Sequence, residues 1–186
     1  ETDPKYATAH SAMGNVLWAK QDLTAADASF VLAVEHSSGI PNVTLTRAQF
    51  KLKIGDRDQA EVIVKDLIDK NPNFVPALIF RANMLGADGL FEDALQVTEL
   101  AQRLSPMNPE ITILASQLDL NSGESEAAVS RLSKLTQRFP EFTVGHLALS
   151  KALLANDERL RASSSIMRVL TLDPNNIEAL LMQAGL

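Results

Sequence analysis

The side chains that could perform chemistry in this chain are few, and their spacing does not assemble a catalytic set. His10, His36 and His146 are the only histidines, and an imidazole near neutral pH can accept a proton or bind a metal. Carboxylate pairs such as Glu124 with Glu126 could share acid–base work. This pair falls at a predicted helix start, where exposed N–H groups favour negative charge. We therefore interpret the histidines at positions 10 and 146 as partly buried structural residues, and the carboxylates as solvated.

Motifs that organise a catalytic site are also missing. The sequence contains no glycine-rich phosphate loop, no GxSxG nucleophile turn and no HExxH metal motif. Serines 163–165 follow one another on a predicted helix with no base close by in the sequence. Cysteine is absent, which excludes disulfides, thiolate catalysis and cysteine-type zinc sites. We expect a protein that is not an enzyme, with no catalytic residues, no metal site and no cofactor.

The composition is that of an ordinary globular domain. Its 186 residues are 46% hydrophobic and 22% charged. Lys and Arg number 17 against 23 Asp and Glu, for a net charge of −6, and no basic patch is evident, so no nucleic-acid partner is expected. No run of 18 apolar residues occurs, so membrane insertion is not expected. A chain without Cys suits reducing and oxidising spaces equally, which leaves the cytoplasm and the bacterial periplasm as alternatives.

An internal repeat of 34 residues organises the chain. Such a period is the sequence signature of a stacked-repeat architecture. Three columns recur at this spacing: the prolines Pro4, Pro72, Pro106, Pro140 and Pro174, with Ser38 in the one place that lacks proline, the alanines Ala26, Ala60, Ala94, Ala128 and Ala162, and the small residues Gly14, Ala48, Ala82, Ser116, Ser150 and Ala184.

Each repeat predicts a hairpin of two helices. Apolar residues recur with helical periodicity in two stretches per repeat, at about 8–20 and 23–36 in the first. Proline lacks an N–H and disfavours helical geometry before it, so it separates one hairpin from the next. Gly55, Gly89 and Gly123 share one position between the two stretches, which predicts a left-handed residue after the first helix. Gln21 and Asp157 hold that position in the outer repeats.

Side-chain size predicts where the columns lie in the fold. The alanine and small columns are expected where the two helices of a hairpin cross, because only small side chains let the helix axes approach. Bulkier columns should fill the space between hairpins: Phe30, Val64, Leu132 and Ile166, with Thr98 as a polar exception, and Ala33, Leu67, Ala101, Leu135 and Val169.

These columns resemble the tetratricopeptide repeat family. The resemblance gives five full units, 7–40, 41–74, 75–108, 109–142 and 143–176, with residues 1–6 ending a preceding repeat and residues 177–186 forming the first helix of a partial sixth. It implies an all-α fold, a right-handed α-solenoid of stacked antiparallel hairpins forming one continuous domain excised from a longer chain. The large residues of the family pattern are replaced by charge at Arg47, Lys51, Arg81 and Asp119, which sets the packing of the second and fourth repeats apart from that pattern.

The resemblance also implies a partner-binding groove along the first helices. The groove-facing residues carried over from the family are Asn15, Gln49, Asn83, Gln117 and Lys151 at repeat position nine, Ser11, Leu45, Ile79, Ile113 and Leu147 at position five, and Trp18, Leu52, Gly86, Leu120 and Leu154 at position twelve. Four of the five residues at position nine are amides, which can both donate and accept hydrogen bonds. Such a column suits an extended peptide, with aliphatic pockets selecting its side chains. The alternative is an ordinary helix surface on which these amides bind nothing.

The function expected from this surface is a non-catalytic scaffold that holds a peptide or a partner helix in its groove. The alternative is a regulatory or substrate-recruiting array of a larger enzyme, or of a bacterial envelope protein for secretion or sorting. The NPNF motif at residues 71–74 resembles the repeats of such envelope proteins. Lys151 is the only cation in the position-five and position-nine columns. The carboxylate clamp with which some family members capture chaperone tails is therefore not expected.

Two further surfaces are predicted from charge and hydropathy. The charges of the second helices, including Lys65 and Arg131, carry mixed signs and are expected to form a solvated face. Ile177, Leu180 and Leu181 belong to a helix without a hairpin partner. Because uncapped repeat ends tend to associate, we expect self-association through this C-terminal helix.

Overall fold

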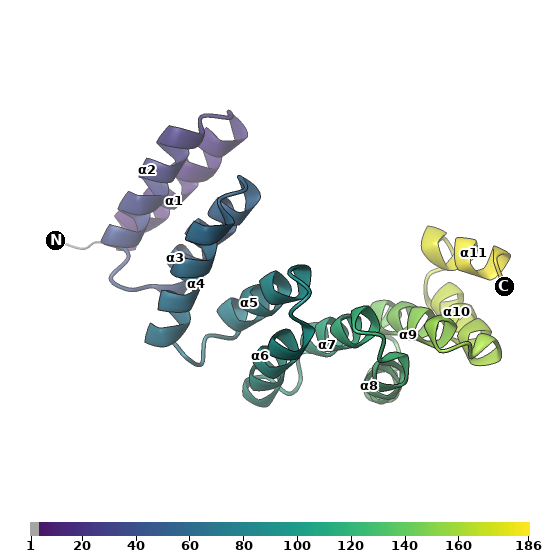
Figure 1. The fold of residues 1–186 in the computed structure, drawn as a ribbon. Helices are drawn as coiled ribbons and strands as arrows, with labels where there is room; N and C mark the ends of the chain where they lie inside the picture. Colours follow the sequence, from purple (N-terminus) through teal and green to yellow (C-terminus); the bar gives the residue numbers. More distant parts are fainter. Residues whose placement is uncertain (1–3) are drawn as a thin grey trace. The chain divides into compact units, whose positions relative to one another are not determined.

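The computed structural model describes residues 4–186, with side chains from Tyr6 onward, and every regular element in that range is an α-helix. The first and second helices of the hairpins alternate along the chain (Figure 1). From α2 on, successive first helices, and likewise successive second helices, begin 34 residues apart. The expected all-α architecture of helical hairpins is confirmed. The helices are α1 (Pro4–Ala19), α2 (Leu23–His36), α3 (Pro41–Lys53), α4 (Arg57–Lys70), α5 (Val75–Ala87), α6 (Phe91–Leu104), α7 (Pro109–Asn121), α8 (Ser125–Arg138), α9 (Thr143–Ala155), α10 (Arg159–Leu172) and α11 (Ile177–Ala184).

The chain divides into two compact units, one ending at Arg81 and the other running from Ala82 to Leu186. In the first unit α1 packs on α2 and α3 packs on α4, and α3 also contacts both helices of the hairpin before it. In the second unit α6 to α11 pack in succession, and α7 also contacts α9. Within each unit, then, a hairpin is held by its own two helices and by the hairpin next to it, as stacked repeats require.

The first hairpin begins earlier than the repeat register predicts. Helix α1 starts at Pro4, so residues 4–6 belong to this helix and do not end a preceding repeat. Proline fits the first turn of a helix because its missing N–H would have no partner there. Residues 1–3, which the register assigns to the same preceding repeat, lie outside the described residues.

The turn inside each hairpin contains one left-handed residue at the same repeat position. Gly55, Gly89 and Gly123 have φ angles of +88°, +76° and +90°. Gln21 and Asp157 take the same conformation, with φ of +65° and +57°, although a side chain there costs about 1–2 kcal/mol. The prediction is confirmed for all five turns, including the two without glycine.

The helix crossings are built from the predicted small residues. All five alanines of the alanine column are completely buried. The small column is buried from Gly14 to Ser150, while Ala184 near the end of α11 is exposed. A Cβ atom added to Gly14 would lie 2.9 Å from ring carbons of Phe30. The ring of Phe30 thus occupies the space that the missing side chain leaves.

The two bulkier columns lie in the interior, as expected. Phe30, Val64, Leu132 and Ile166 are each no more than 1% exposed. Thr98, the polar exception, is buried too, and its hydroxyl donates a hydrogen bond of 2.7 Å to the carbonyl of its own helix at residue 94. A buried hydroxyl with a partner carries little cost, which explains how a threonine fits this apolar column.

Two of the prolines between hairpins, Pro106 and Pro140, also link one hairpin to the next. The carbonyl oxygen of Pro106 accepts a hydrogen bond of 3.3 Å from Arg138 on α8. The carbonyl oxygen of Pro140 accepts two, of 3.3 and 3.1 Å, from Arg168 on α10. In both cases the donor belongs to the second helix of the following hairpin, so each turn is fixed by the hairpin that comes after it.

Candidate functional site

A cavity of about 220 Å³ opens along the first helices of the second unit. Residues 113, 117 and 120 of α7 share one helix face because they are spaced by four and three, and residues 147 and 151 of α9 do the same. Ile113, Gln117, Leu120, Leu147 and Lys151 all line the cavity. The structure therefore brings four residues of the predicted position-five and position-nine columns to one site, which we call the groove cavity.

The groove cavity combines an apolar wall with one amide. Ile113, Leu120 and Leu147 are partly buried, whereas Gln117 is exposed. The side-chain N–H of Gln117 donates a hydrogen bond of 3.0 Å to the Asn121 carbonyl oxygen one turn further along α7. Its own carbonyl oxygen has no partner among residues 4–186. An accepting amide beside an apolar wall suits a ligand that presents an N–H together with an apolar side chain.

An ion pair that the sequence did not predict lies in the lining of the groove cavity. Lys151 Nζ lies 2.7 Å from a carboxylate oxygen of Glu178 on α11, and the two side chains are 45% and 52% exposed. So exposed a pair contributes about 0–1 kcal/mol, but it cancels the charge of the only lysine in the cavity. One sequence feature could have indicated this pair: Glu178 follows Lys151 by 27 residues and lies in the first turn of α11, the first helix of the next repeat.

The other predicted amides do not line this cavity. Asn83 is exposed on α5, and Ile79 is half-buried on the same helix. Asn15 and Gln49 are exposed on α1 and α3 and belong to the first unit. Their exposure leaves them accessible to a partner, and their participation in a groove stays a prediction.

Two apolar residues predicted for the groove take part in packing within the first unit. Trp18 is half-buried and meets Phe50 edge to face, with ring centroids 5.7 Å apart and an interplanar angle of 84°. Leu45 is only 6% exposed, because the helix that carries it packs against both helices of the first hairpin. Leu45 is thus covered by packing within the first unit, and its participation in a groove stays a prediction.

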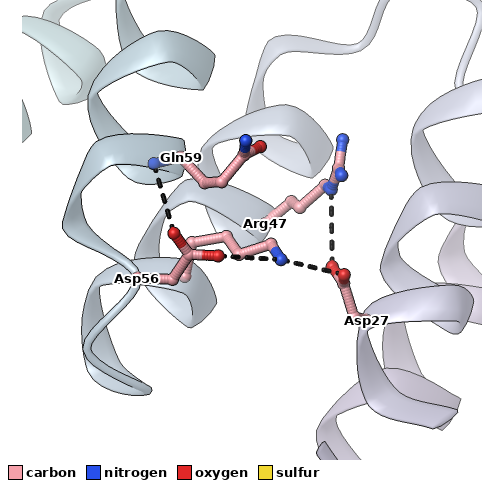
Figure 2. A network of polar contacts seen from close by, with 5 residues as sticks. Asp27, Arg47, Asp56 and Gln59 are labelled. Atoms are coloured by element: carbon pink, nitrogen blue, oxygen red, sulfur yellow. Dashed lines mark hydrogen bonds and ion pairs between the residues drawn. The ribbon is translucent and has the colours of Figure 1, made fainter. Parts of the chain in front are cut away.

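A charged network joins the first two hairpins. The Lys51 ammonium donates to Asp27 on α2 at 2.9 Å and to Asp56 at the start of α4 at 3.3 Å. Arg47 also faces Asp27, but its Nε lies 3.8 Å from Asp27 Oδ1, which is too long for a hydrogen bond (Figure 2). Asp56 also accepts the backbone N–H of Gln59 and so caps α4. Burial lowers the pKa of Lys51, but the hydrogen bonds to the two aspartates outweigh it and place the pKa above its usual value.

A second buried charge lies in the second unit. The Asp119 carboxylate is 4% exposed and accepts a hydrogen bond of 2.7 Å from Arg131 Nε on α8. Burial raises the pKa of Asp119 above its usual value, and the attraction of Arg131 only partly opposes this. Arg131 is thus the partner of a buried carboxylate, and the expectation that it belongs to a fully solvated face is wrong.

The histidines serve packing and hydrogen bonding. The rings of His10 and His36 stack at 5.6 Å with an interplanar angle of 14°. A ring nitrogen of His146 lies 3.0 Å from the carbonyl oxygen of Pro140. Across the described part of the chain, no group of three or more His, Asp or Glu side chains could hold a metal ion. Nor does any described helix combine the length and the hydropathy that crossing a membrane demands.

Solved structures place this arrangement among known folds. No protein-family model and no curated protein matches the sequence. MamA from Desulfovibrio magneticus superposes with a TM-score of 0.74 at 16% identity, covering 92% of this chain and 97% of that one. TTC0263, a TPR (tetratricopeptide-repeat) protein of Thermus thermophilus, gives a TM-score of 0.71 at 20% identity over 96% and 97%. YrrB, a TPR protein with an unusual peptide-binding site, gives 0.70 at 15% identity over 94% and 90%.

The chain has the tetratricopeptide-repeat fold. Lys51 and Asp119 occupy the same tetratricopeptide-repeat position, eleven, where the family pattern calls for a large apolar residue. Each forms an ion pair with a residue of another helix: Lys51 pairs with Asp27, and Asp119 pairs with Arg131. A buried charge without such a partner would be costly, so these ion pairs explain how charged side chains are accommodated at position eleven of the second and fourth repeats.

Proposed function

We propose that this chain is a non-catalytic interaction module that holds a peptide, or an exposed helix, of a partner protein in the groove cavity. The observation that carries the proposal is that Ile113, Gln117, Leu147 and Lys151, chosen by repeat position, line one cavity. A volume of about 220 Å³ is suited to one or two side chains and not to a whole small molecule, for which pockets of about 300–1,000 Å³ are usual.

The chemistry of the lining favours a peptide over a charged ligand. Lys151 is neutralised by Glu178, so the cavity offers no net charge. Gln117 can pair with a peptide backbone, and Ile113 and Leu147 can bury an aliphatic side chain of the same peptide. The unusual peptide-binding site named for YrrB supports a peptide ligand by analogy of fold.

The proposal is tested by selecting a peptide from a random display library on the wild-type chain and measuring its Kd by fluorescence anisotropy. Gln117→Ala should weaken binding by about 0.5–1.5 kcal/mol. Ile113→Asp should weaken it more than tenfold, because a carboxylate would have to be desolvated in the apolar wall. The matched control is Gln137→Ala, which removes an exposed amide from α8.

The control decides the interpretation. If Gln137→Ala weakens the peptide as much as Gln117→Ala does, or if Ile113→Asp binds normally, the groove cavity is not the binding site. The same surface would also serve a recruiting array within a larger enzyme or a bacterial envelope protein. A catalytic domain in the same polypeptide would favour that second function.

A further inference from the structure

The second unit carries another cavity, of about 270 Å³, whose charge differs from that of the groove cavity. Residues of α6, α7 and α8, with the turns that follow α6 and α8, form its lining. Three lining residues, Arg131, Lys134 and Arg138, are basic, and none is acidic. We call this the basic cavity.

Two of the three cations are held in place by other groups. Arg138 donates to the carbonyl oxygen of Pro106 at 3.3 Å, and its guanidinium carbon lies 5.8 Å from the ring centroid of Phe139. Arg131 is fixed by the buried Asp119 carboxylate at 2.7 Å. A guanidinium has five N–H donors, so both side chains keep donors for a ligand after making these contacts.

The third cation is uncommitted. Lys134 is exposed on α8 and has no ion pair or hydrogen bond to any of residues 4–186. It lies one turn before Arg138 on the same helix, so the two side chains share a face. A lysine without a partner at the edge of a cavity is available to an incoming anion at no cost in broken contacts.

The surroundings strengthen the positive charge. An adjoining cavity of about 220 Å³ shares Gln102 and Arg131 with the first and adds Arg103 and one carboxylate, Glu99. Asp119 offsets the charge of Arg131, which leaves three cations, Arg103, Lys134 and Arg138, against one exposed carboxylate in a chain whose net charge is −6. Helix α7 begins at the basic cavity, with Asn108 and Pro109 in its lining, and the start of a helix carries partial positive charge.

We propose that the basic cavity is a docking site for an acidic segment of a protein partner. A Glu or Asp side chain of that segment is held by Lys134 and Arg138, and an apolar neighbour packs against Phe139 and Leu135. The surface shares no lining residue with the groove cavity, which residues of α7, α8, α9 and α11 line and which has no net charge. The chain therefore offers one neutral and one basic surface, and charge complementarity selects which part of a partner meets each.

The test uses the complete chain and a short fluorescein-labelled peptide that alternates Glu with Leu, followed by fluorescence anisotropy at low salt. The matched peptide carries Gln in place of Glu. Lys134→Glu should weaken the acidic peptide by about threefold to tenfold, with no loss of thermal stability, because this lysine has no internal partner. Arg138→Gln should also weaken it. Lys65→Glu, the same charge reversal on an exposed lysine of α4, should not.

Four results would overturn the proposal. The first is that the Gln peptide binds as well as the Glu peptide, which would show that the carboxylates are not recognised. The second is that Lys65→Glu weakens binding as much as Lys134→Glu, which would indicate a general charge effect. Displacement of the probe by inorganic phosphate, but not by acetate at equal ionic strength, would show a site for phosphate groups. Loss of the acidic peptide in Gln117→Ala, with normal binding in Lys134→Glu, would place it in the groove cavity and leave the proposed function standing.

Discussion

The two buried charges at repeat position eleven should differ in how much stability their neutralisation costs. Lys51→Met removes the ammonium and keeps an apolar stem of similar length, whereas Asp119→Asn keeps the shape of the side chain and removes its charge. The pKa of each group is raised. A raised pKa means that the fold favours charged lysine but uncharged aspartic acid. We therefore expect the lysine variant to be destabilised and the aspartate variant to be nearly unaffected.

The magnitudes follow from contacts and exposure. Lys51 makes two charge-assisted hydrogen bonds, but Asp27 and Asp56 are 32% and 37% exposed and would regain water in the variant. We expect Lys51→Met to cost about 1–2 kcal/mol, below the cost of breaking a fully buried pair. The amide of Asp119→Asn can still accept from Arg131, and no carboxylate is then buried. Its stability at neutral pH should lie within about 0.5 kcal/mol of wild type or above it.

The assay is urea unfolding followed by two signals. Trp18 is the only tryptophan and packs on Phe50, next to Lys51 in the sequence, so its fluorescence reports on the first unit. Circular dichroism of the helices reports on both units and is the signal for Asp119→Asn. If at neutral pH the aspartate variant loses more stability than the lysine variant, the assignment of favoured and disfavoured charge is refuted.

The same pair of variants gives a pH dependence with a defined sign. The folded state binds the Asp119 proton more tightly than the unfolded state does, since burial raises this pKa above 3.8. Wild type therefore loses stability as the pH rises from 3.8 through the raised value, and Asp119→Asn should gain relative to it over that interval. The contribution of Lys51 is present below its usual value of 10.5 and disappears as the pH rises through the still higher folded value.

Three other predictions concern packing, turns and association. Ala94→Leu and Ala128→Leu should each lower stability in thermal melts by roughly 1–3 kcal/mol, because both alanines are fully buried at helix crossings; unchanged melting would contradict the crossing geometry. Gln21→Gly should stabilise and Gly55→Ala destabilise by about 1 kcal/mol each, since both positions have positive φ, and the reverse order would count against strain in these turns. Leu181 is 69% exposed on α11, so Leu181→Glu should reduce concentration-dependent association in sedimentation experiments. A wild-type protein that stays monomeric at high concentration would exclude self-association through this helix.

The features predicted from sequence are those that side-chain size and backbone conformation determine locally. The alanine column had to be buried because no larger residue fits a close helix crossing, and all five alanines are at 0% exposure. The left-handed turn position could be predicted even for Gln21 and Asp157, because the length of the turn is constant.

The features missed depend on which helices come into contact. Lys51 could be recognised as a departure from the pattern, but its partner Asp27 lies 24 residues away on another helix. Arg131 looked like one more solvated charge until Asp119 was found buried against it. The basic cavity draws its residues from α6, α7 and α8 together, so no single stretch of sequence indicated it.

The hydrogen bonds between turns and later hairpins have a consequence for how the chain folds. Arg138 reaches back 32 residues to Pro106, and Arg168 reaches back 28 residues to Pro140. The packed helix pairs within each unit are likewise neighbours or next neighbours along the chain. Contacts of such short sequence separation close small loops, which favours rapid folding. A hairpin can also open without disturbing those beyond its neighbour, so amide hydrogen exchange should proceed in steps of one hairpin.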